Sequence, residues 1–159
     1  MGKSKSKNLF KNKIVWLILL AFFFIISSIQ LLDKKIIVPK EVKINVKNYN
    51  YYLETAATPN ERKIGLSNRQ NLCTNCGMLF IFNKQGTYSF WMKDTFIPLD
   101  IIWLDKNFKI VKISTVLETN SEKRYTNKVK AKYVIELNAN EVFKRDLNVG
   151  DTIQLPDFK

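Results

Sequence analysis

Residues 77–82 read GMLFIF, and this short run decides which kind of fold the chain can adopt. Successive side chains of an extended strand point to opposite faces, so Phe80 and Phe82 share one face while Leu79 and Ile81 share the other. Both faces are apolar, which is typical of a strand buried on both sides. The sequence therefore predicts a sheet that is covered on both faces at this strand.

Shorter strand-like segments surround this run on both sides. They alternate apolar and polar residues or are rich in β-branched and aromatic residues, and turn residues separate them. The turn after GMLFIF is expected at Asn83–Gly86, and a hairpin loop is expected at Asp105–Asn107. The expected strands lie at residues 42–46, 49–57, 87–92, 99–104, 108–116, 132–137 and 151–155.

The clearest helix signal is Thr58-Pro59-Asn60-Glu61. Threonine with glutamate three residues later forms a capping box, and proline suits the first helical position. A second, short helix is possible at residues 140–147. Together these elements predict an α+β domain of mostly antiparallel strands, built as a compact, partly closed barrel with one early helix, because closure removes exposed sheet edges.

The N-terminus predicts a membrane anchor. Residues 1–13 carry five lysines and no acidic residue, and residues 14–32 carry no charge. Nineteen helical residues span about 28 Å, close to the hydrocarbon thickness of a bilayer. The lysines favour a cytoplasmic tail, so a linker at residues 33–41 and a globular domain at residues 42–159 are expected outside the membrane. A cleaved signal peptide is the alternative, although its apolar core is usually shorter.

Charge and composition narrow the possible partners. The formal net charge is +12, of which about +7 belongs to the predicted outer domain. Such a balance favours acidic neighbours such as anionic lipid head groups or cell-wall polymers, or simply gives a soluble lysine-rich surface. The lysines of the outer domain are scattered and form no basic run interleaved with aromatic residues, so nucleic-acid binding is not expected. No cofactor motif is present, and no protein partner can be named.

Cys73 and Cys76 are the only cysteines of the chain. A structural zinc site takes four ligands, and one chain without histidine cannot supply them from two thiols alone. Redox pairs of this spacing lie at the start of a helix, whereas a strand-like run follows here. Two interpretations remain for one chain: a local disulfide, or two unpaired thiols in a tight turn. A metal site shared between two chains is a third alternative. We expect a structural disulfide and no metal within one chain.

The polar residues around Trp91 form the first candidate site. Lys93, Asp94, Thr95 and Asp100 follow Trp91 closely, and together they could edge an aromatic platform for a sugar ring or another flat polar ligand. The alternative is structural: Trp91 then packs under the early helix, and Asp100 caps a turn or pairs with an arginine.

Two further residues are candidates for ligand binding. Glu136 lies within a strand that should be mostly buried, so its carboxylate needs an arginine or a ligand as partner. Arg69 could bind a ligand's carboxylate or phosphate, or pair internally with Asp100 or Glu136.

The sequence gives little support for catalysis. The absence of histidine excludes Ser-His-Asp and Cys-His arrangements within one chain, and no glycine-rich phosphate loop is present. Carboxylates for acid–base chemistry are available at Glu54, Asp94, Asp100 and Glu136, but no spacing singles out a pair.

Five segments in a fixed order form a recognisable pattern: ETAATPNERKIGLSNR (54–69), GMLFIF (77–82), FWMKDTFIPLDIIWLD (90–105), YVIEL (133–137) and NVGDTI (148–153). Through these segments, most of the outer domain resembles the domain-of-unknown-function 192 family (uncharacterised protein family 0127). The resemblance implies a fold, shared polar positions and frequent export or anchoring, but no reaction. Ser67 stands where that family usually has methionine, and Asp94 stands where it has asparagine, so a ligand of its relatives would be bound differently here.

These observations lead to one functional hypothesis and two alternatives. The first is a membrane-anchored extracytoplasmic binding or accessory module for anionic or hydroxylated cell-envelope material. The second is a carboxylate-dependent hydrolase acting on envelope glycans. The third is a scaffold that docks a protein partner through a sheet edge.

Overall fold

The computed structural model describes residues 16, 20, 38–156 and 158 of the chain. Apart from Trp16 and Leu20, the predicted tail and anchor lie outside the described residues, as does most of the predicted linker. Within the described part, no helix is both long and apolar enough to cross a bilayer.

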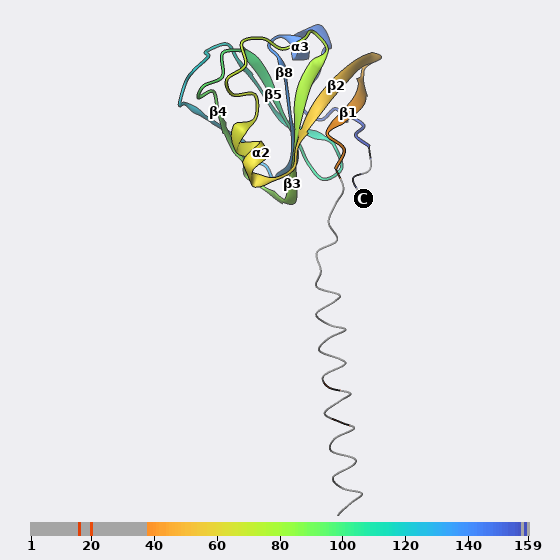
Figure 1. The fold of residues 1–159 in the computed structure, drawn as a ribbon. Coiled ribbons are helices and arrows are strands. Elements are labelled where there is room, and N and C mark those ends of the chain that lie inside the picture. The colour runs from red at the N-terminus through yellow and green to blue at the C-terminus, as the bar shows by residue number, and fades with distance from the viewer. Residues whose placement is uncertain (1–15, 17–19, 21–37, 157, 159) are drawn as a thin grey trace, which may run out of the picture. The chain divides into compact units, whose positions relative to one another are not determined.

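A six-stranded sheet with the strand order β1-β2-β3-β8-β5-β6 organises the domain (Figure 1). All neighbouring pairs are antiparallel except β2 and β3, which run parallel and are joined through α2. A separate pair, β4 with β7, lies outside this sheet. The elements are β1 (Glu41–Val46), β2 (Tyr49–Ala56), α2 (Pro59–Ile64), β3 (Cys76–Gly86), β4 (Ser89–Trp91), β5 (Leu99–Leu104), β6 (Ile110–Val116), β7 (Arg124–Thr126), β8 (Ala131–Asn138) and α3 (Glu141–Lys144).

The prediction of a mostly β domain is confirmed, whereas the partly closed barrel is wrong. The large sheet stays open, with β1 and β6 as its edge strands. The segment expected as a final strand forms only isolated bridges, from Gln154 to Asn45 beside one edge and from Thr152 to Lys109 beside the other. The chain thus meets both edges without joining them by a continuous hydrogen-bond ladder.

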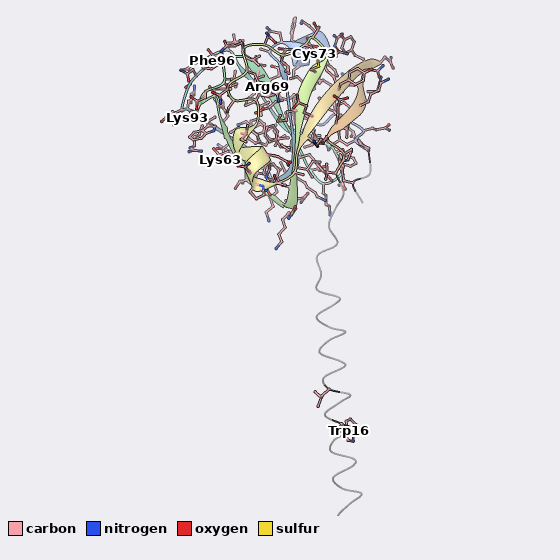
Figure 2. The ribbon with its side chains drawn as sticks, in the orientation of Figure 1. Trp16, Lys63, Arg69, Cys73, Lys93 and Phe96 are labelled. Atoms are coloured by element: carbon pink, nitrogen blue, oxygen red, sulfur yellow. A yellow bond between two sulfur atoms is a disulfide. The ribbon has the colours of Figure 1, made fainter. Side chains whose placement is uncertain are left out.

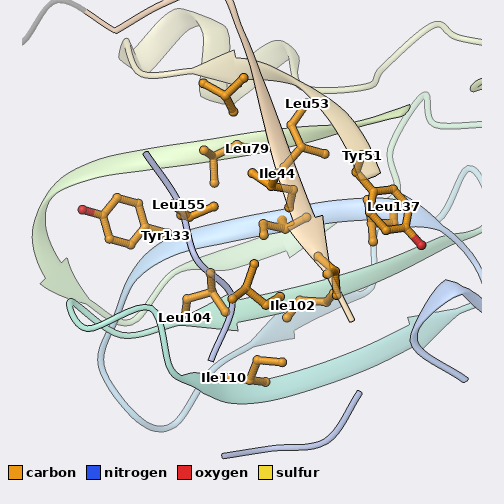
Figure 3. Close-up of a cluster of buried hydrophobic side chains, with 14 of the residues drawn as sticks. Ile44, Tyr51, Leu53, Leu79, Ile102, Leu104, Ile110, Tyr133, Leu137 and Leu155 are labelled. Atoms are coloured by element: carbon orange, nitrogen blue, oxygen red, sulfur yellow. The ribbon is translucent and has the colours of Figure 1, made fainter. Parts of the chain in front are cut away.

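The strand β3 carries a core on each of its faces, as the sequence predicts. Leu79 and Ile81 belong to a cluster that we call the first core, which Figure 3 shows with residues from β1, β2, β5, β6 and β8 around it. Phe80 belongs to a second core on the opposite face, and Phe82 packs against it. The prediction from GMLFIF is therefore confirmed.

The helix α2 begins where the capping box predicts. The Thr58 side chain accepts a hydrogen bond from the Glu61 backbone N–H, and the Glu61 carboxylate accepts one from the Thr58 backbone N–H. No side chain of α2 is buried, so the helix lies on the surface. The second core is instead built partly from residues outside the large sheet: Leu66 after α2, Phe90 of β4, and Met92 and Ile97 after β4.

The structure extends β3 through residues 83–86, where the sequence indicates a turn. The pairing of β3 with β8 shifts register between Ile81 and Gly86, so the strand continues beyond an irregularity. The actual reversal is the short segment between Gly86 and Ser89. As a result β4 is only three residues long and pairs with β7, and this arrangement places Trp91 opposite Arg124.

Candidate functional site

Trp91, at the end of β4, is the centre of the candidate site. Three neighbouring hollows of about 270, 490 and 30 Å³ lie beside α2, and both Trp91 and Lys63 line all three. We call this surface the Trp91 groove. Arg62, Lys63 and Ile64 of α2, together with Trp91, Lys93 and Arg124, form the part of its wall used below.

Cations surround the Trp91 ring. The Arg124 guanidinium carbon lies 4.7 Å from the ring centroid and the Lys93 Nζ lies 5.5 Å from it, both within cation–π range. Figure 2 shows Lys63 and Lys93 on the side of the domain where α2 lies. The Trp91 ring is therefore partly buried with basic side chains against it, and its use as a platform for a ligand stays a prediction.

Most of these cations have no carboxylate partner. Lys93 forms an exposed ion pair with Glu122 at 3.1 Å. Arg62 donates hydrogen bonds to the backbone carbonyls of Ala57 and Ile81. Within the described part of the chain, Arg62, Lys63 and Arg124 make no ion pair. The groove therefore carries a local excess of positive charge, which attracts anions.

Hydrogen bonds among three loops hold Asn68 and Asp94, which line the hollow of about 490 Å³. The Asn68 backbone N–H donates to the Asp94 carbonyl at 2.6 Å, and the Asp94 N–H donates to Asn120 Oδ1 at 3.2 Å. Asp94 has a φ of 54°, a left-handed conformation that aspartate and asparagine tolerate better than most residues. Thr95 is 5% exposed and donates to the Lys93 carbonyl at 3.3 Å. Four predicted residues, from Trp91 to Thr95, thus lie together.

Glu136 is one of the residues that line the smallest of the three hollows. It sits in the middle of β8, between Met78 of β3 and Ile101 of β5, on the face that carries the second core. Its side chain is 5% exposed, and burial raises the pKa of its carboxyl to about 8. Of the hydrogen bonds and ion pairs found in the described part of the chain, none involves this carboxyl. The predicted arginine partner is therefore not present.

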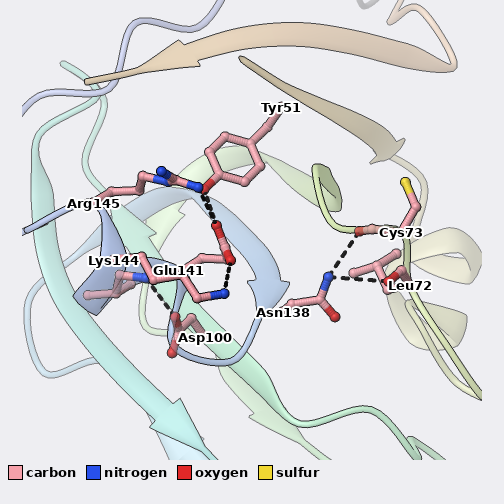
Figure 4. Close-up of polar contacts among 9 residues, drawn as sticks. Tyr51, Leu72, Cys73, Asp100, Asn138, Glu141, Lys144 and Arg145 are labelled. Carbon is pink, nitrogen blue, oxygen red and sulfur yellow. Dashed lines mark hydrogen bonds and ion pairs between the residues drawn. The ribbon is translucent and has the colours of Figure 1, made fainter. Parts of the chain in front are cut away.

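Asp100 does not join this site, which corrects the predicted cleft. Asp100 is fully buried, and in the sheet it stands opposite Leu137 of β8, a first-core residue. Directly opposed residues share a face, and Glu136 is next to Leu137 in β8, so Asp100 and Glu136 lie on opposite faces of the sheet. Asp100 Oδ1 accepts a hydrogen bond from the Thr115 hydroxyl at 2.6 Å, and Oδ2 accepts one from the Val142 backbone N–H at 2.8 Å (Figure 4). Asp100 therefore stabilises the first turn of α3, in line with the structural alternative.

The variant D100N tests this structural role. One carboxylate oxygen becomes an NH₂ group, which does not accept a hydrogen bond. The side chain can then no longer accept from both Thr115 and Val142, so we expect a loss of about 2 kcal/mol of unfolding free energy. Urea denaturation measures it, with D146N as control, because the Asp146 side chain is 91% exposed. A D100N variant within about 0.5 kcal/mol of the wild type would contradict this role.

Arg69 binds a different partner from those expected. Its Nη1 and Nη2 donate to the two oxygens of Glu54 at 2.5 and 2.7 Å, a bidentate pair between the loop after α2 and strand β2. Hydrogen bonds from Arg69 lower the pKa of the Glu54 carboxyl. Both side chains are partly exposed, so the pair contributes little to stability. Arg69 thus pairs internally, away from Asp100 and Glu136.

Cys73 and Cys76 are joined in a disulfide. The Asn138 side-chain amide donates to the carbonyls of Cys73 and Leu72, at 3.0 and 3.3 Å, which attaches this turn to the end of β8 (Figure 4). Where the structure describes side chains, no group of three or more histidine, cysteine or acidic residues is placed to hold a metal ion.

A buried polar cluster around Glu141 lies on the face of the sheet that carries the first core, and the sequence does not reveal it. Glu141 is 1% exposed and accepts hydrogen bonds from Tyr51 at 2.5 Å and Lys144 at 2.7 Å (Figure 4). Burial and the hydrogen bond to Glu141 raise the pKa of Tyr51 to about 12. Arg145 also contacts both side chains. This buried acid has partners on all sides, so its role is structural.

Comparison with known proteins places the domain in a family. The model of the DUF192 family, described as "Uncharacterized ACR", matches residues 41–155. The chain belongs to this family. The resemblance predicted from the sequence is confirmed, and DUF192 remains a family without an assigned activity.

Two solved structures share the DUF192 fold found here. A Sinorhizobium meliloti protein proposed to be a transcription regulator is 28% identical, with a TM-score of 0.67, 72% of this chain covered and 91% of the other. A Novosphingobium aromaticivorans protein of unknown function is 26% identical, with a TM-score of 0.65, 72% of this chain covered and 84% of the other. No curated protein matches this chain.

Lys63 and Arg124 are the site residues that the sequence analysis missed. Lys63 is one of many scattered lysines, and nothing in its spacing marks it. Arg124 belongs to β7, which has only three residues, too few to show a strand period. Its position opposite Trp91 depends on the β4–β7 pairing, which is set by tertiary structure.

Proposed function

We propose that this DUF192 domain is an extracytoplasmic binding module, held at the membrane by residues 14–32, whose ligand is anionic, hydroxylated cell-envelope material. The ligand lies in the Trp91 groove. The five lysines of residues 1–13 and the uncharged segment after them support this orientation of the anchor, with the tail on the cytoplasmic side.

One observation carries this proposal: Trp91 borders all three hollows, and the hollow of about 270 Å³ is also lined by Arg62, Lys63 and Arg124, which make no ion pair in the described part of the chain. Guanidinium groups bind carboxylates and phosphates through paired hydrogen bonds, and ammonium groups bind them as point charges. A hydroxylated ring suits a groove that mixes aromatic carbon with polar edges. Because Arg124 and Lys93 already contact the Trp91 ring, the ligand meets these cations as well as the aromatic surface.

The structure excludes Asp100 and Glu136 as a catalytic pair for the hydrolase alternative. Asp100 and Glu136 lie on opposite faces of the sheet, so they cannot flank one glycosidic bond. Glu54 is bound to Arg69. No observation at the groove favours hydrolysis or docking of a protein partner over binding.

The variant W91A tests the groove. We expect its affinity for glucuronate, used as an anionic sugar probe, to fall about tenfold, which corresponds to about 1.4 kcal/mol of contact with the ring and its cations. Titration calorimetry on the full chain in a non-ionic detergent measures the affinity. R124A should show a similar loss.

The matched control is F143A. Phe143 is 86% exposed and lies on α3. Asp100 binds the first turn of α3 from the first-core face of the sheet, which is opposite the face of Glu136 and the second core. Removal of the Phe143 side chain should leave binding unchanged. Equal affinity of W91A and wild type for every bound probe, with the fold intact by circular dichroism, would place the ligand elsewhere.

A further inference from the structure

The smallest hollow of the groove has an unusual lining. This hollow has a volume of about 30 Å³, and the Glu136 side chain forms part of its lining. Leu66, Phe80 and Phe90 supply apolar lining. Arg62 and Lys63 of α2 line the same hollow, as does the buried Thr95. A space of this volume accepts a single group about the size of a water molecule, so a sugar ring cannot enter it.

The Glu136 carboxyl has no hydrogen-bond or ion-pair partner within the described part of the chain. Its side chain is only 5% exposed, and it lines the hollow. Burial alone raises its pKa to about 8, so at pH 7 most molecules carry a neutral carboxylic acid there. A neutral acid donates one hydrogen bond and does not repel an anion.

We propose that this inner hollow binds one oxyanion of the ligand, a carboxylate or phosphate oxygen that accepts a hydrogen bond from the protonated Glu136 side chain. Arg62 and Lys63 balance the charge of the oxyanion from α2. The proposal rests on the proposed function, since the oxyanion belongs to the ligand of the Trp91 groove, and it adds which group is recognised and what releases it.

Ionisation of Glu136 is the event that releases the ligand. A deprotonated carboxylate loses its donor and places a negative charge against the oxyanion. The charged groups that line the hollow besides Glu136 are Arg62 and Lys63 of α2. The neighbours from β3, β5, β4 and the loop beyond it, which are Met78, Ile101, Trp91 and Thr95, carry no charge.

The test measures affinity against pH on the full chain in non-ionic detergent. The probe is glucuronate, whose carboxylate does not titrate in this range, and glucose is the neutral control. We expect wild-type affinity at pH 9 to be about tenfold weaker than at pH 7, because the bound state requires the protonated side chain. Methyl phosphate, compared with glucuronate at one pH, identifies which oxyanion fits better.

Two variants separate the proton from the shape of the pocket. Glu136→Gln still donates a hydrogen bond but cannot ionise, so its affinity should stay constant between pH 7 and pH 9. Glu136→Leu removes the donor and should bind weakly at both values. Circular dichroism establishes that each variant is folded.

The outcomes distinguish this inference from the proposed function. A flat wild-type profile, or the same tenfold fall in Glu136→Gln, overturns the role of Glu136 even if binding still depends on Trp91. Equal binding of glucose and glucuronate overturns recognition of an oxyanion. Absence of binding to either oxyanion at any pH overturns this inference and the proposed ligand class together.

Discussion

Replacement of Gly77 by alanine is expected to lower the free energy of unfolding by about 3 kcal/mol. Gly77 lies in β3 between its neighbours β2 and β8. An added Cβ would overlap the backbone carbonyl oxygen of Glu136 and lie 2.7 Å from one methyl carbon each of Leu53 and Leu137. A carbonyl held in a sheet ladder cannot move aside without loss of its neighbours' hydrogen bonds.

Urea denaturation of G77A and wild type, monitored by far-ultraviolet circular dichroism, measures this loss. The matched control is G86A at the other end of the same strand. There the added methyl group would meet only the side chain of Tyr88, at 3.2 Å. A Tyr88 side chain can shift, so G86A should lose less than about 1 kcal/mol. If G77A is as stable as G86A, the close approach of β3 to its neighbours is not as described.

Replacement of Glu136 by glutamine is expected to stabilise the domain by about 3 kcal/mol at pH 7. Glutamate in the unfolded chain releases its proton near pH 4.5, whereas burial raises the pKa of folded Glu136 to about 8. Between these values the folded state binds more protons than the unfolded state, so wild-type stability falls as pH rises, by about 1.4 kcal/mol per pH unit from this residue. Glutamine has no proton to lose, so the variant lacks this slope.

The measurement is the unfolding free energy of both proteins at pH 4, 5.5, 7 and 8.5. The two curves should lie close together at pH 4 and separate steadily as the pH increases. E54Q provides a control of opposite sign, because hydrogen bonds from Arg69 lower the pKa of Glu54 in the folded state. Its loss should be small and present only above the unfolded pKa, and it should vanish in acid. Parallel curves for E136Q and wild type would show that Glu136 is not buried as a neutral acid.

At Glu136 the expected pH dependence of binding and the stability of the domain therefore oppose each other. An apolar or amide side chain at position 136 would make a more stable domain, since no desolvated acid would remain. The presence of glutamate there therefore favours a functional explanation over a structural one.

Local rules predicted most of the fold. The alternation in GMLFIF predicted the two faces of β3, and the capping box predicted the start of α2, because both depend on residues close in sequence. Closure of the sheet depends on contacts between its distant edges, and no local pattern reports those. The extension of β3 to Gly86 was missed for a similar reason, since pairing with Ala131 of β8 overrides the turn preference of residues 83–86.

The site was predicted only in part, and strand register explains the division. Trp91 to Thr95 are adjacent in sequence and stay adjacent in space. Asp100 was grouped with them because it is near in sequence, yet the alternation along β5 directs it to the face opposite Ile101 and therefore opposite Glu136. The basic residues of α2 and β7 are brought to Trp91 by tertiary packing, which spacing alone does not reveal.

The isolated bridges made by Thr152 and Gln154 have a consequence for self-association. Unpaired edge strands invite a second copy of a chain to add its own strand, which is a common start of aggregation. Here residues 152–154 lie against both ends of the open sheet, at Lys109 and Asn45. At these two positions the segment occupies backbone groups that a second copy of the chain would otherwise pair with.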